Sequence, residues 1–409
     1  MRRRVLAAVL ASILMAAGCG SGAVTPAVKA GPGVTSDTIS LGVLTDMSGP
    51  FSPTALVRIK GYELFLDELN GRGGICGRKV KLTLKDHGFN VQRALDGYFE
   101  LEPKVLGFLD LTGTAMTAAI APDLIQTRAL AAPVSWSAAL LGNPHMMIVG
   151  GTYDIDVMNG LEHFKRTGVI KNGDTIGHIH VNGDFGSNAL EGSAFTAQQW
   201  GLTLVEQSVN ETATDVTAQV KALKSGGAKA VVLSTSPPQT AAIVATADAL
   251  GWDVPFMVNV ASYDPAILKT PAAAAVLKRV QVVSPIAPYG ANAPGPQAVA
   301  KAFEAKYPDI EANGSVNHGY AVAMAFGAVL EKACADKDLS RDGVLRAFRD
   351  TNGVETSGLT GSLRFSIAGR PSATQSYVAK PDDKVKGGLV VVEKLFESEL
   401  VKAKGTRAK

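Results

Sequence analysis

The sequence predicts an α/β protein of two similar lobes, each with a parallel sheet covered by helices on both faces. Short apolar segments alternate with segments of helical spacing, and the alternation occurs in two runs of similar length. The chain has 409 residues with 46% hydrophobic and 6% aromatic content, which suits two buried cores and excludes a disordered chain.

The first run contains four strands and three helices. The helical spacing of Ile59, Tyr62 and Leu66 predicts a helix, and Asn70-Gly71 ends it. We expect strands at 39–44, 80–84, 105–109 and 129–134, and helices at 58–70, 91–102 and 117–126.

The second run repeats this alternation, and the last third of the chain departs from it. Helices are expected at 155–167, 187–201, 216–224 and 240–250, and strands at 175–181, 203–209, 228–234 and 255–258. After Pro285, helices at 297–306 and 318–335 and strands at 359–365, 375–379 and 389–395 are too few for a third domain. We expect them to complete the first two lobes.

The N-terminal segment has the pattern of an export signal. Arg2-Arg3-Arg4 precede an apolar run that is shorter than the ~20 residues of a membrane-spanning helix. Ala16-Ala17-Gly18-Cys19 resembles a bacterial lipobox, so we expect residues 1–18 to be removed, Cys19 to be lipidated and 19–37 to form a flexible tether. The alternative is an ordinary secretory signal.

The charge excludes a nucleic-acid partner. The formal net charge of +3 includes the three N-terminal arginines and four basic residues in a tail at 399–409, so the body carries about −4.

With Cys19 assigned to lipid, Cys76 and Cys334 remain as an even pair in an oxidising compartment, which favours a disulfide. Two separate buried thiols are the alternative.

Motifs of catalysis and cofactor binding are missing from the sequence. It has no Gly-x-Ser-x-Gly, Walker or His-Glu-x-x-His motif, and 71–76 has Cys76 where a dinucleotide fingerprint needs glycine. His178 and His180 share one face of a strand, but no further ligand is near, so we expect one buried, hydrogen-bonded histidine, one histidine that faces a loop, and no metal. His163 and His318 are isolated on predicted helices. We expect no enzyme activity and no cofactor.

Polar and aromatic residues follow the predicted strands, where open parallel sheets bind ligands. Helix N-termini that begin there would favour an anionic group, although any one of these residues alone is better explained as a helix cap. These loops lie at 46–51, 110–114, 135–137, 182–186, 234–237 and 259–263.

Several of these segments resemble the leucine/isoleucine/valine-binding type of periplasmic binding protein. The resemblance is carried by 47–50, 70–75 and 77–80, and continues through Asp86, Gly107, 184–186 and 249–251. It implies a type I fold, in which two doubly wound lobes joined by three crossovers close on a ligand for an ABC importer. The crossovers are expected near Gly151, Pro285 and Gly361, which gives a first lobe of 38–151 plus 285–361 and a second of 152–284 plus 362–398.

The resemblance also implies ligand-binding residues. In the family, the loops matching 110–114 and 135–137 hold the ligand's carboxylate and amino groups. This chain lacks an acid before Asp264 in the loop that usually pairs with an ammonium, so an ordinary α-amino acid requires Asp110 to supply the charge. The expected contacts are Phe51, Asp110, Thr112, Ser135, Trp136, Ser137, Phe185, Ser236, Asn259 and Tyr289.

These features predict a monomeric lipoprotein that is held outside the membrane by its lipid anchor and delivers a small polar or amino-acid-like solute to an ABC permease. A sensor that presents the same fold to a signalling receptor is the first alternative. A secreted hydrolase is the second.

Overall fold

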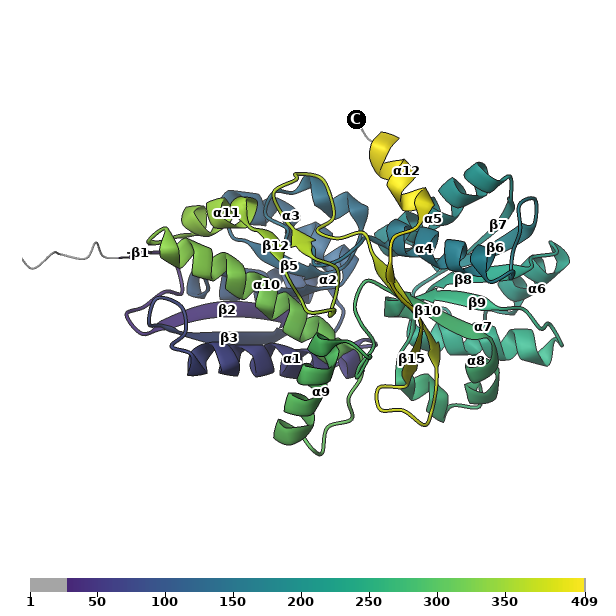
Figure 1. Cartoon of the computed structure of the whole chain (residues 1–409), viewed down its shortest axis with the longest axis horizontal. Coiled ribbons are helices and arrows are strands. Elements are labelled where there is room, and N and C mark those ends of the chain that lie inside the picture. The colour runs from purple at the N-terminus through teal and green to yellow at the C-terminus, as the bar shows by residue number, and fades with distance from the viewer. Residues whose placement is uncertain (1–27, 408–409) are drawn as a thin grey trace, which may run out of the picture.

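The computed structural model describes residues 28–407 and has two lobes side by side, with α1 and α10 in one and β6 to β9 in the other (Figure 1). The predicted fold class of two parallel-sheet lobes is confirmed. The signal segment, Cys19 and the first part of the predicted tether lie outside the described residues.

The first lobe is built on a four-stranded parallel sheet in the order β3-β2-β4-β5. Its strands are β2 (Thr38–Thr45), β3 (Lys79–Asp86), β4 (Gly107–Thr112) and β5 (Ala131–Val134). Its helices are α1 (Ser52–Gly71), α2 (Val91–Leu101), α3 (Thr114–Thr127), α9 (Pro294–Lys306), α10 (Ser315–Ala335) and α11 (Arg341–Asp350), with 3-10 turns η1 (Glu102–Lys104) and η2 (Ala138–Gly142). Two small pairs, β1 (Lys29–Ala30) with β11 (Asp338–Leu339) and β12 (Asn352–Val354) with β13 (Leu363–Arg364), complete it.

The second lobe is built on a seven-stranded sheet in the order β15-β14-β10-β9-β8-β6-β7, parallel except where β14 meets β10 and β15. Its strands are β6 (Thr175–Val181), β7 (Thr203–Val209), β8 (Ala230–Ser234), β9 (Phe256–Asn259), β10 (Val280–Ser284), β14 (Ser376–Pro381) and β15 (Leu389–Phe396). Its helices are α4 (Tyr153–Arg166), α5 (Asp184–Trp200), α6 (Thr217–Ser225), α7 (Pro237–Ala249), α8 (Ala273–Arg279) and α12 (Glu399–Arg407), with turns η3 (Val260–Ser262) and η4 (Pro265–Lys269).

Three crossing segments join the lobes and touch one another. The backbone amide of Gly150 donates to Ser372 Oγ at 3.0 Å, and a Cβ on Gly150 would lie 2.9 Å from Pro285 Cβ. The first two of these segments contain Gly150 and Pro285. The third comes later than Gly361, because β13 pairs with β12 and Phe365 packs in the first-lobe core.

Both ends of the described chain are more ordered than the sequence analysis expects. Residues 28–37, assigned to a flexible tether, include β1 and the Thr35 carbonyl, which accepts a 2.7 Å hydrogen bond from Arg78 Nε. The predicted basic tail forms α12, whose Leu400 and Val401 are buried against α4 (Figure 1). Strand β10 is absent from our prediction, because its five residues follow a short helix with no turn signal between them.

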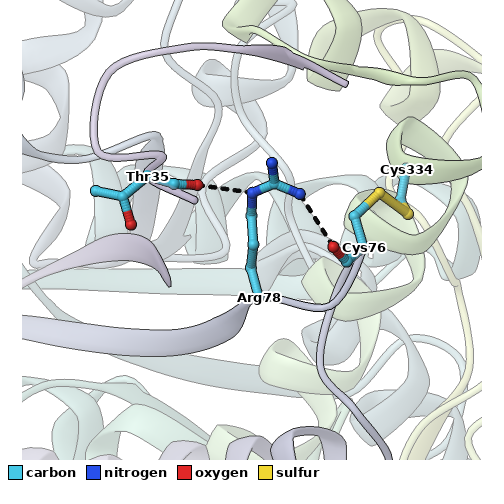
Figure 2. Close-up of a disulfide and its surroundings, with 4 residues drawn as sticks. All are labelled: Thr35, Cys76, Arg78 and Cys334. Carbon is cyan, nitrogen blue, oxygen red and sulfur yellow. Dashed lines mark hydrogen bonds between the residues drawn. A yellow bond between two sulfur atoms is a disulfide. The ribbon is translucent and has the colours of Figure 1, made fainter. Parts of the chain in front are cut away.

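Cys76 and Cys334 form a disulfide in the structure, with Cα atoms 5.7 Å apart across a sequence separation of 258 residues. Figure 2 shows the bond joining the loop after α1 to the last turn of α10, with Arg78 donating to the carbonyls of Cys76 and Thr35. The bond therefore ties the start of the first lobe to the segment that returns to it.

Candidate functional site

A cavity of about 590 Å³ lies between the lobes, at the carboxyl ends of strands in both sheets. Its first-lobe wall comes from the loops after β2 to β5 and from α10, and its second-lobe wall from the loops after β6 to β9 and the crossing at 284–288. Most of its side chains are apolar or aromatic, and they include Pro50, Phe51, Phe89, Val134, Trp136, Tyr153, Val181, Phe185, Val260, Ala261, Tyr263, Pro265, Val282, Ile286, Ala287, Pro288, Ala379 and Leu389.

Two aspartates fix the loop that carries Phe51. Asp46 accepts the backbone amides of Gly49 at 2.6 Å and Phe51 at 2.9 Å. Asp86 accepts the Met47 amide at 2.8 Å, and although burial alone would raise the pKa of Asp86, its hydrogen bonds lower it. The ring of Phe51 is thereby held 4.8 Å from that of Phe89, and both line the cavity.

Trp136 is both a core residue and a wall of the cavity. It is 6% exposed, its Nε1 donates to the Val149 carbonyl at 2.9 Å, and its indole contacts Tyr153 edge-on. Trp136, expected from the sequence as a ligand contact, lines the cavity and also belongs to the hydrophobic cluster beneath it.

The other predicted site residues divide into two groups. Thr112, Phe185 and Ser236 line the cavity with Phe51 and Trp136. Ser135, Ser137 and Asn259 are buried and do not line it: Ser135 Oγ is 2.7 Å from Thr114 Oγ1, Ser137 Oγ accepts the amide of Ala139 in η2, and Asn259 accepts from Ser234. Contact of these residues with a ligand stays a prediction.

Asp110 is not free to meet a ligand ammonium, which corrects our expectation for this residue. It is fully buried, and its Oδ2 accepts from Arg58 Nε at 3.0 Å and from the Tyr62 hydroxyl at 2.9 Å. Its Oδ1 accepts from Thr112 at 2.7 Å. Burial would lower the pKa of Arg58, but Asp110 and Tyr62 raise it, so the guanidinium stays charged and neutralises Asp110.

Tyr289 lies outside this cavity, contrary to the sequence analysis. After the second crossing the chain enters the first lobe, where the Tyr289 ring packs edge-on against Phe303 and its hydroxyl donates to the Ala300 carbonyl at 3.3 Å. Tyr289 borders a separate cavity of about 640 Å³ between α9 and residues 383–388.

The cavity has lining residues that were not predicted from the sequence, among them Phe89 and the following four. Arg58 and His318 were interpreted as members of ordinary helices, Tyr153 follows the first crossing, and Asp264 was noted only for its position. Asp264 is 8% exposed, its Oδ2 has no partner among the described residues, and burial raises its pKa. Arg58 and His318 could have been identified from the sequence, because each is a charged or polar residue on an otherwise apolar helical face.

The histidine pair is part of the protein's own hydrogen bonding. His178 Nε2 lies 3.0 Å from Ser234 Oγ and its Nδ1 2.9 Å from Ser193 Oγ, and His180 Nε2 lies 3.1 Å from Glu206. Within residues 28–407 no cluster of three or more His, Cys, Asp or Glu side chains is placed to hold a metal ion.

None of the helices described in that range is both long and apolar enough to span a membrane.

A buried acid stands beside the crossing segments. Asp156 on α4 accepts a hydrogen bond from Ser376 Oγ at 2.6 Å. Burial and the nearby Asp154 raise the pKa of Asp156 to about 8, although this hydrogen bond opposes the rise. Because the folded state keeps a proton that the unfolded state loses above about pH 4, stability falls as the pH rises from 4 through 8.

Asp156→Asn should remove this pH dependence, since the amide fits the same site and does not ionise. Between pH 6 and 7.5, we expect the unfolding free energy of the wild type to fall by up to about 1.4 kcal/mol per pH unit more than that of the variant. Urea unfolding across this range is the measurement, with exposed Asp350→Asn as control. Parallel pH profiles for wild type and Asp156→Asn would contradict the raised pKa.

The chain is similar in sequence and in structure to known binding proteins. The sequence profile described as periplasmic binding protein matches residues 38–386. A fatty acid ABC transporter substrate-binding protein from Thermomonospora curvata is 36% identical, with 92% of this chain and 96% of that chain covered and a TM-score of 0.88. A search of curated proteins gave no match.

Two more distant structures share the fold. A branched chain amino acid ABC transporter protein from Thermus thermophilus with bound valine is 18% identical, covers 91% of this chain and 100% of its own, and has a TM-score of 0.77. A leucine binding protein from Thermotoga maritima is 16% identical, with 88% and 99% covered and a TM-score of 0.76.

Proposed function

Because the chain belongs to the periplasmic binding protein family, we propose that it is a monomeric extracytoplasmic substrate-binding protein that delivers a largely apolar ligand to an ABC importer. The family resemblance expected from the sequence is confirmed by the match over 38–386. In this proposal the lobes close on the ligand without chemical turnover. The ligand binds the closed state more tightly than the open state and so stabilises it, and the importer recognises the closed state.

The apolar lining of the interlobe cavity is the observation that carries the ligand class. Aromatic rings from both lobes face the cavity, with Phe51 and Phe89 on one side and Phe185 with Tyr153 at a centroid distance of 4.5 Å on the other. Such surfaces favour hydrocarbon, because burying it releases the free energy of apolar transfer. The name of the 36% identical relative, a fatty acid transporter protein, supports the same class.

An α-amino acid is the second candidate, and Asp264 favours it. Its unpartnered Oδ2 lies in the cavity wall and could accept from an ammonium. Against this, burial raises the pKa of Asp264, which favours the neutral form, and Asp110 is already paired with Arg58. Neither Asp264 nor Asp110 is therefore a free, ionised carboxylate for an ammonium. Asp184 and Glu211 also line the cavity, and burial raises the pKa of Glu211 as well.

Calorimetric titration of the purified protein with dodecanoate and with leucine separates the two classes. We expect dodecanoate to bind and leucine to give no heat of binding at the same concentrations. Asp264→Asn should leave dodecanoate affinity within about threefold, because no charged contact is lost. Tight leucine binding that Asp264→Asn abolishes would contradict the proposal and favour the amino acid.

We further propose that the chain is attached to the membrane through a diacylglycerol on Cys19. The lipobox-like sequence supports this attachment, and two acyl chains suffice for stable anchoring. Cys19→Ser should release the protein from the membrane fraction of an exporting bacterium. Retention of that variant in the membrane with unchanged mass would contradict lipidation.

A further inference from the structure

We infer that the ligand's head group is a carboxylate and that it binds at one corner of the interlobe cavity, formed by Arg58, His318 and the first turn of α3. This inference rests on the proposed function and deepens it by naming the charged part of the ligand and the residues that hold it. We call this place the head-group corner.

The three parts of the head-group corner are neighbours. Arg58 Nη2 donates to Thr112 Oγ1 at 2.6 Å, and the chain passes from Thr112 directly into the first turn of α3. The ring of His318 lies against Trp136 at a centroid distance of 4.7 Å and an interplanar angle of 33°. All of these residues line the same cavity.

Two glycines bring Arg58 and His318 together by letting α1 and α10 cross in backbone contact. A Cβ on Gly61 would lie 2.3 Å from the Val316 carbonyl, and a Cβ on Gly319 would lie 2.2 Å from the Arg58 carbonyl. No side chain fits at either position. The crossing therefore sets a short separation between the two helices at the level of the cavity.

Hydrogen-bond donors in the head-group corner lack partners. His318 is 6% exposed and Arg58 is 3% exposed. Neither ring nitrogen of His318, nor Nη1 of Arg58, makes a hydrogen bond to another described residue, whereas Arg58 Nε and Nη2 are both used. These side chains are nearly buried and line the cavity, so a ligand group placed there could accept from Arg58 Nη1 and from the N–H of the His318 ring.

The first turn of α3 adds backbone donors to the head-group corner. Gly113 precedes this helix at a φ of 94° and provides no side-chain cap, so the amides of the first turn face the cavity unpaired. Such amides, at the positive end of the helix dipole, favour an anion. Together with Arg58 and His318 they provide donors for both oxygens of a carboxylate.

The charge balance suits an anion with one apolar tail. Asp110 cancels the charge of Arg58 before binding, and burial together with the Arg58 charge lowers the pKa of His318 well below its usual value, so the ring is neutral. Away from this corner, Val260, Ile286 and Leu389 give the cavity an apolar surface that would take the chain of the ligand, while Asp184, Glu211 and Asp264 are its acidic lining residues.

The test compares dodecanoate with dodecan-1-ol, which has the same chain and no charge, by calorimetric titration. We expect the wild type to bind the acid at least about tenfold more tightly than the alcohol. His318→Phe keeps the ring on Trp136 and removes its nitrogens, and it should weaken the acid about tenfold or more while leaving the alcohol within about threefold. Arg58→Lys keeps a cation for Asp110 and should likewise weaken only the acid.

His145→Phe is the matched control, because His145 is 4% exposed in the first lobe and does not line the cavity. It should change neither affinity. Two results would overturn the head-group corner and leave the proposed function intact. One is that the wild type binds acid and alcohol with equal affinity. The other is that neither His318→Phe nor Arg58→Lys changes the affinity for the acid. A wild type that binds neither probe overturns the proposed function, and this inference with it.

Discussion

Arg58→Met is expected to lower the unfolding free energy by about 3–5 kcal/mol at pH 7. The substitution leaves Asp110 fully buried, with Tyr62 and Thr112 as its only remaining hydrogen-bond donors among the described side chains. Removing one member of a buried ion pair leaves an uncompensated charge, which is far more costly than removing both. Urea unfolding followed by circular dichroism measures the difference.

The control for this prediction is the double variant Arg58→Met/Asp110→Asn. An amide at 110 can still accept from Tyr62, and no charge is left behind, so we expect it to recover most of the lost stability. If Arg58→Met alone stays within about 1 kcal/mol of the wild type, the Arg58–Asp110 pair does not stabilise the first lobe as described here.

Cys76→Ala/Cys334→Ala is expected to destabilise the protein by about 2–5 kcal/mol. The disulfide spans 258 positions of sequence, so it restricts the unfolded chain strongly. It joins the loop after α1 to α10, and these two helices carry Arg58 and His318. Urea unfolding with and without reductant measures the effect.

In the wild type the reductant should shift the midpoint to that of the double variant, and the double variant should not respond. A wild-type midpoint that is unchanged after complete reduction would show that the bond contributes no stability. Non-reducing peptide mapping of the exported protein provides the accompanying check, and it should recover the peptides of Cys76 and Cys334 joined.

The fold could be predicted because its evidence is local. The strands of the first sheet are short apolar or alternating segments, and Asn70-Gly71 marks the end of α1 within one residue. The exceptions are segments whose order depends on distant partners. The pairing of β1 with β11 and the packing of Leu400 and Val401 on α4 join parts of the chain that no local pattern connects.

The site was only partly predictable, for the same reason. Thr112, Trp136 and Phe185 follow strands, and chain position alone places them at the cavity. Asp110 lies in the same strand as Thr112, but the cation that neutralises it comes from a helix 52 positions earlier. His318 gains its meaning only from the crossing of α1 and α10 at Gly61 and Gly319, a contact that requires the folded first lobe.

Native mass spectrometry of the protein purified gently from an exporting bacterium tests the central claim most directly. We expect one bound molecule per chain, released on unfolding and identified as an apolar carboxylic acid, with occupancy lost in His318→Phe and retained in His145→Phe. Recovery of an α-amino acid or a polar sugar as the bound molecule would contradict the assignment of this cavity to an apolar acid.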